Sequence, residues 1–174
     1  IGWLHLKKAM QAFLCSGLVL FVALFAVGCQ SSGNGGSLKA EQIVFDMECQ
    51  ISVSASEKEV ACGTLKNSGT ETIFILTSPE TAKGLCYQDI NGIVHISLND
   101  LSIDGAEALL PEYSWFSQLV SVLRYAKEQP QLLESQGNGQ FSGSTEQGVS
   151  FVVTARNKGT VESITVDRYQ IKFL

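Results

Sequence analysis

Histidine is scarce in this sequence, and the motifs that usually accompany catalysis are missing. Of the two histidines among 174 residues, only His95 lies beyond the first few residues. No GxSxG motif is present to place a nucleophilic serine beside it. Residues 137–143 are rich in glycine, but they lack the GK[ST] ending of a phosphate-binding loop. We therefore expect no catalytic residues and a protein that is not an enzyme.

The chain also lacks the residue spacings of a metal site. It has five cysteines but no CxxC pair, whereas a zinc site needs about four ligands at characteristic spacings. Asp100, Asp104 and Glu107 form an acidic segment, which Leu101 and Ile103 interrupt. Calcium-binding loops place oxygen ligands at defined positions, so a solvated loop is the favoured interpretation. We expect no metal and no cofactor.

No acidic residue occurs before Glu41, and residues 10–27 carry no charge at all. Lys7 and Lys8 precede this apolar run, and a basic region followed by an apolar one is typical of an export signal. A membrane-spanning helix of about 18 residues is the alternative. The run ends on small residues directly before Cys29, which favours a cleaved signal.

The sequence AVGC at residues 26–29 resembles the lipobox of bacterial lipoprotein signals. The resemblance implies cleavage before Cys29, which then carries a diacylglyceryl group and begins the mature chain. Two acyl chains hold a protein firmly on a membrane. Residues 30–37, QSSGNGGS, form a flexible linker with a root-mean-square reach of about 15 Å. We expect a lipid-anchored protein on the extracytoplasmic face of the cell membrane.

This organisation divides the chain into a signal peptide (1–28), an anchor with its linker (29–41) and one folded domain (42–174). Cleavage removes two lysines and leaves ten Lys and Arg residues against seventeen Asp and Glu residues, a net charge of −7. An acidic domain is a poor partner for nucleic acid or for anionic lipid headgroups. The expected partners are the membrane, through the anchor, and either an apolar ligand or another protein.

Alternating apolar and polar residues dominate the proposed domain. Residues 43–54 alternate almost perfectly, which predicts a strand buried on one face in an antiparallel sheet. Asn91 and Gly92 form a strong hairpin signal between two further strands. Together the pattern predicts successive strands at residues 43–54, 59–67, 72–77, 85–90, 93–98, 139–145, 148–155 and 161–174.

The spacing of the first hairpin leaves a disulfide open as an interpretation. A four-residue loop at residues 55–58 would place Ile51 opposite Cys62, with Cys49 diagonally across on the same face. A slight change of register would then permit a Cys49–Cys62 bond. Buried free thiols acting as small apolar side chains are the favoured alternative.

Residues 111–129 have the pattern of an amphipathic helix. Trp115, Leu119, Val122 and Ala126 recur at helical spacing and predict a broad apolar face. Such a face needs a cover, and the sheet can supply it. The predicted class is therefore α+β, with a strongly curved antiparallel sheet, a half barrel, packed on one main helix.

The order of these features resembles that of small bacterial lipoproteins with a LolA/LppX-like domain, of the Gram-positive, clostridial type. The features are the lipobox, the linker, the successive strands, a bend from Pro79 to Gly84, a Leu-Pro pair before the helix and terminal strands separated by a polar turn. The resemblance implies a curved sheet around a hydrophobic concavity. It also implies binding of a lipid or action through a protein partner.

The aromatic cluster at the start of the predicted helix has two interpretations. Tyr113, Trp115 and Phe116, with Leu119 and Leu123, either fasten the helix to the sheet or line a cavity for an acyl chain. Our leading hypothesis is a lipoprotein that binds a lipid or another hydrophobic ligand at the cell envelope. The alternative is an envelope interaction module, without a ligand, that contacts a spore or cell-wall protein.

Overall fold

The computed structural model describes residues 37–105, 110 and 114–174. The predicted signal, the anchor Cys29 and most of the linker lie outside these residues, as do Glu107, Pro111 and Tyr113. Residues 37–174 form one compact unit that contains the hydrophobic core. Within the described residues, no helix is long and apolar enough to cross a membrane.

The compact unit consists mainly of strands. They are β1 (Met47–Ala55), β2 (Lys58–Ser68), β3 (Glu71–Ser78), β4 (Cys86–Ile90), β5 (Ile93–Leu98), β6 (Leu101–Asp104), β7 (Glu134–Gly137), β8 (Gln140–Ser144), β9 (Ser150–Ala155), β10 (Val161–Val166) and β11 (Tyr169–Phe173). The described helices are α2 (Trp115–Glu128) and the short 3-10 helices η1 (Ala40–Gln42), η2 (Glu80–Ala82) and η4 (Pro130–Leu132).

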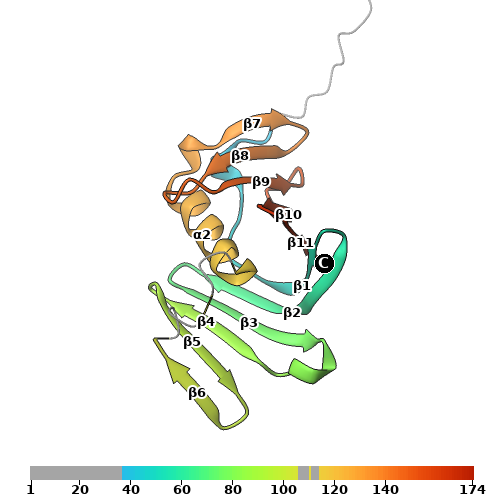
Figure 1. The fold of residues 1–174 in the computed structure, drawn as a ribbon. Helices are drawn as coiled ribbons and strands as arrows, with labels where there is room; N and C mark the ends of the chain where they lie inside the picture. The colour runs from blue at the N-terminus through green and yellow to red at the C-terminus, as the bar shows by residue number, and fades with distance from the viewer. Residues whose placement is uncertain (1–36, 106–109, 111–113) are drawn as a thin grey trace, which may run out of the picture. The chain divides into compact units, whose positions relative to one another are not determined.

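All eleven strands belong to one antiparallel sheet, in the order β6-β5-β4-β3-β2-β1-β11-β10-β9-β8-β7 (Figure 1). Strands β1 to β6 pair in sequence order, as do β7 to β11, and β1 also pairs with β11. That pairing joins the first six strands to the last five. Strands β6 and β7 are left as the two edges of the sheet.

The predicted fold class was wrong. The protein is mostly sheet, an open eleven-stranded one with a single α-helix among the described residues, rather than an α+β half barrel of the LolA-like type. The sequence pattern missed β6 and β7 and read β10 and β11 as one strand. Alternation continues through the β10–β11 hairpin, and the turn contains no glycine: Asp167 itself adopts a positive φ of 52°.

The register predicted for the first hairpin was also wrong. Ser56 and Glu57, with φ values of 49° and 67°, form a tight two-residue turn instead of a four-residue loop. Cys62 therefore lies opposite Ser52 rather than Ile51. By contrast, the predicted hairpin at Asn91 and Gly92 is confirmed, since Ile90 pairs with Ile93 around it.

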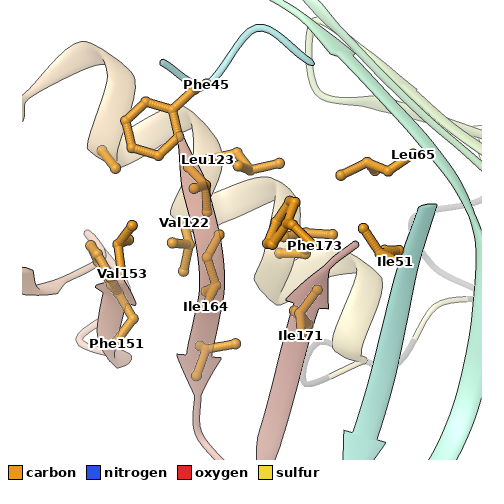
Figure 2. Packing of buried hydrophobic residues seen from close by; sticks show 14 of the residues in the cluster. Phe45, Ile51, Leu65, Val122, Leu123, Phe151, Val153, Ile164, Ile171 and Phe173 are labelled. Atoms are coloured by element: carbon orange, nitrogen blue, oxygen red, sulfur yellow. The ribbon is translucent and has the colours of Figure 1, made fainter. Parts of the chain in front are cut away.

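Helix α2 lies on one face of the sheet, between β7–β9 on one side and β1–β4 on the other (Figure 1). Ser114 caps its first turn by accepting a hydrogen bond from the Ser117 backbone N–H, and such a cap stabilises a helix by about 1 kcal/mol. Figure 2 shows Val122 and Leu123 of the helix packed among sheet residues such as Ile164. Each fully buried aliphatic side chain of this kind contributes about 1.5–3 kcal/mol.

Two ion pairs fasten the outer side of α2 to the sheet. Arg124 pairs with Asp89 of β4, and Lys127 pairs with Asp46, which precedes β1. The helix is therefore held on the sheet both by apolar packing and by two ion pairs.

Candidate functional site

A cavity of about 350 Å³ lies beside α2. Its walls are formed by the β4–β5 hairpin, the helix, the segment between β8 and β9, and Leu110, which precedes the helix. Its lining residues are Asp89, Gly92, Val94, Leu110, Phe116, Ser117, Gln118, Val120, Ser121, Arg124, Thr145, Gln147 and Val149. This lining combines an apolar part with a polar one, as small-molecule sites usually do.

Gln118 is a buried polar residue in this lining. The residue is only 4% exposed, and neither Nε2 nor Oε1 has a hydrogen-bond partner among the described residues. A buried amide without partners costs about 1–3 kcal/mol, and most buried polar groups avoid this cost. A hydrogen-bonding group that enters the cavity could therefore satisfy this amide.

The charged part of the wall is internally paired. Arg124 Nη2 donates to Asp89 Oδ1 at 2.8 Å, and the Asp89 side chain is 8% exposed. The same oxygen accepts a hydrogen bond from the Gly92 backbone N–H at 3.2 Å. A buried carboxylate needs such partners because desolvation disfavours its charged form.

The wall between β8 and β9 is held in place by Thr145. Its backbone N–H donates to the Val149 carbonyl, and its hydroxyl accepts from the Val149 N–H at 3.2 Å. Thr145 is itself buried. This side of the cavity is therefore a hydrogen-bonded loop rather than loosely packed chain.

A second, more polar hollow of about 280 Å³ lies on the other side of Arg124. Its buried groups are satisfied: the Thr72 hydroxyl donates to Asn67 Oδ1, and Asn67 Nδ2 donates to the Phe45 carbonyl. Among the described residues, the buried amide of Asn67 is therefore partnered, whereas that of Gln118 is not. Gln118 thus differs from the buried polar residues of the second hollow, which are hydrogen-bonded.

The residues predicted to line a ligand cavity lie in different parts of the structure. Leu119 and Leu123 are buried in the core against the sheet, whereas Phe116 also borders the cavity. Trp115 is half-buried, and its ring meets that of Phe74 edge to face with centroids 4.8 Å apart. Tyr113 lies outside the described residues. The predicted lining of an acyl-chain site remains a prediction.

Sequence reasoning missed Gln118, Asp89, Arg124 and Thr145. A signal existed for Gln118, because it lies three residues after Trp115 and four before Val122, on an apolar stripe of the helix. For the other three residues no sequence signal was available, since they meet only through the fold.

Cys49, Cys62 and Cys86 are free thiols, so the Cys49–Cys62 bond is not formed. Cys49 lies opposite Leu65 and Cys62 opposite Ser52, three positions apart along β1, so the two side chains leave opposite faces of the hairpin. Burial raises the pKa of all three thiols, most directly that of Cys49.

The titratable residues of the described chain do not form a metal centre. No group of three or more His, Cys, Asp or Glu side chains is placed to hold a metal ion in this part of the protein. His95, on β5, pairs through Nδ1 with Asp104 of β6 at 2.8 Å, away from the cavity lining.

No protein-family model matches this chain, and no curated protein sequence does. The arrangement beside α2 is therefore interpreted from its own chemistry.

Proposed function

We propose that this protein is an exported lipoprotein, anchored to the membrane through Cys29, that binds a small amphipathic ligand in the cavity beside α2. The proposal includes no catalysis. The ligand is a lipid-like or other partly apolar molecule of the cell envelope, and the domain is held on the extracytoplasmic face by its linker.

One observation carries the binding proposal: the buried, unpartnered amide of Gln118 borders a cavity of about 350 Å³. Protein ligand sites have volumes of about 300–1,000 Å³ and place a few polar groups among apolar ones. Here Leu110, Phe116 and Val120 provide apolar surface. A ligand that hydrogen-bonds Gln118 would remove the cost of leaving this amide unsatisfied.

The membrane part of the proposal is supported by sequence alone. The AVGC motif follows a basic and then an apolar segment, and a Gly/Ser-rich linker follows the cysteine. Cys29→Ala tests this part in a bacterial host that processes lipoproteins. We expect the wild-type chain to incorporate labelled palmitate and to fractionate with membranes, and the variant to incorporate none. Equal palmitate labelling of both chains would contradict the anchor assignment.

The binding part is tested by native mass spectrometry of residues 37–174 after mild extraction from the host. We expect a copurified molecule of a few hundred daltons that is released on unfolding. Gln118→Leu should lose it, whereas Gln131→Leu, a change at an exposed glutamine of η4, should retain it. Identical occupancy in both variants would show that the ligand does not use this amide.

A second candidate function, an interaction module, is favoured by the edge strand β6. Leu101 and Ile103 are 76% and 51% exposed, and no described strand pairs with the outer side of β6. Natural sheets usually protect such edges with charge or irregularity. Residues 86–104 contain no Lys or Arg, so the partner chemistry would be an extended segment with alternating apolar and basic residues.

Crosslinking in the native host separates the two candidates. Under the interaction hypothesis, a photoreactive residue at position 101 should capture one dominant envelope protein, and Leu101→Lys should abolish the capture. A photoreactive residue at position 75, also on an exposed apolar side chain of the sheet, serves as the control. Equal labelling from both positions would contradict a specific edge interaction.

A further inference from the structure

We propose that the cavity beside α2 recognises a neutral carboxamide group carried on a short apolar body, a refinement that rests on the proposed binding function. Gln118 would hydrogen-bond the carboxamide group of the ligand. The neighbouring aliphatic and aromatic side chains would contact its apolar body. The ligand class is thus an acyl amide, a lactam or a small apolar peptide.

The hydrogen-bonding capacity of Gln118 favours a ligand group that both donates and accepts. Its Nε2 donates and its Oε1 accepts, and both atoms lack partners in the described residues. A carboxamide offers one acceptor and one donor and satisfies both atoms at once. A carboxylate only accepts and an ammonium only donates, so either would leave one buried atom of Gln118 unpaired.

The charges around the cavity favour the same choice. Among the described residues, Asp89 and Arg124 are the only ionisable side chains in the cavity lining, and they form an ion pair with each other. An anionic ligand near Arg124 would also face Asp89, and a cationic ligand near Asp89 would also face Arg124. The pair therefore supplies no net attraction for a charged group, while a neutral amide costs little to desolvate by comparison.

The remaining lining defines the body of the ligand. Leu110, Phe116 and Val120 offer apolar surface, and Ser117 and Ser121 lie on the same helix as Gln118. A volume of about 350 Å³ lies at the lower end of the range for ligand sites. This size suits a medium-length chain or a ring rather than a complete diacyl lipid.

Hexanamide, hexanoate and hexylamine provide a matched set of probes, because they share one apolar chain and differ in the polar group. Each would be titrated into residues 37–174, the compact unit that contains the core, and binding would be followed by NMR. We expect hexanamide to bind about tenfold more tightly than either charged probe, since each of those leaves a buried atom unpaired. The side-chain amide resonances of Gln118 should shift only with hexanamide.

Variants at Gln118 complete the test. Gln118→Leu and the more flexible Gln118→Met should each weaken hexanamide binding about tenfold, and Gln131→Leu should leave it unchanged. Hexanoate or hexylamine binding as tightly as hexanamide would overturn the carboxamide assignment but keep the proposed binding function. Failure of all three probes to bind would overturn both.

Discussion

Arg124 of α2 and Asp89 of β4 form an ion pair in which only one partner is buried. The Asp89 side chain is 8% exposed and that of Arg124 is 46% exposed. The pair lies between two hollows and forms part of the wall of both. Its two members therefore contribute unequally to stability, although they share one hydrogen bond.

Arg124→Met should destabilise the domain more than Asp89→Asn. Without Arg124, the buried carboxylate loses its counter-charge, which costs about 3 kcal/mol. In Asp89→Asn, the side chain still accepts a hydrogen bond from the Gly92 backbone N–H. The half-exposed guanidinium of Arg124 is solvated, so we expect the free energy of unfolding to fall by only about 1 kcal/mol. Urea unfolding at pH 7 measures both values, and equal losses would contradict this asymmetry.

Gln118→Leu should stabilise the folded domain while it weakens ligand binding. The variant removes a buried, unpaired amide, whose burial costs about 1–3 kcal/mol, and replaces it with an apolar side chain. Thermal unfolding without ligand is the measurement, with Gln131→Leu as the control at an exposed position. A lower midpoint for Gln118→Leu would show that the amide is satisfied in solution.

Lys127 should make the domain more stable above about pH 4 than below it. The hydrogen bond from Lys127, followed by that from the Gly69 N–H, lowers the pKa of Asp46. A lowered folded-state pKa contributes stability that is complete above the unfolded value, near 4, and is lost as the pH falls through the folded value.

Lys127→Met tests this linkage by unfolding at a series of pH values from 2 to 6. The variant should lose less stability than the wild type as the pH falls through the range below 4, since Asp46 then keeps only the Gly69 bond. Lys83→Met is a suitable control, because Lys83 pairs with the exposed Glu80 within three residues. Parallel curves for wild type and Lys127→Met would contradict the prediction.

The thiols should react slowly in the folded protein and without forming a disulfide. Burial raises the pKa of Cys49 and Cys86, and only the thiolate reacts rapidly. Iodoacetamide at pH 8 should therefore label these residues more slowly than in the urea-unfolded chain. Peptide mapping without reductant should recover Cys49 and Cys62 as separate alkylated peptides, and a linked peptide would contradict the opposite-face arrangement.

The strands could be predicted from the sequence wherever one face is buried and the other is wet. Ile51 and Val53 are buried while Gln50 is exposed, so their alternation marks β1 correctly. The registers could not be predicted in the same way. Ser56 and Asp167 adopt positive φ values, and neither is the glycine by which such turns are usually recognised.

One missed hairpin did carry a signal. Asn138 and Gly139 connect β7 to β8, and the same dipeptide correctly predicted the turn at Asn91 and Gly92. The strand before Asn138 is short, polar and exposed, so alternation alone did not reveal it.

The candidate site was less predictable than the sheet because its residues are brought together by tertiary structure. Asp89 and Arg124 are 35 residues apart, and nothing in either segment identifies the other. Of the aromatic residues that stand out in the sequence, Trp115 contacts Phe74 of the sheet, and Phe116 borders the cavity. The amide of Gln118 draws attention only once its lack of a partner is seen.

The pairing of β1 with β11 has a consequence for how the chain reaches its native state. The edge of β1 that receives β11 cannot be covered until residues 169–173 have been made, since Ile51 pairs with Phe173. Contacts between such distant residues slow folding, and an open strand edge invites aggregation in the meantime. Strand β11 lies between β1 and β10, so its loss would leave two strand edges unprotected in the middle of the sheet.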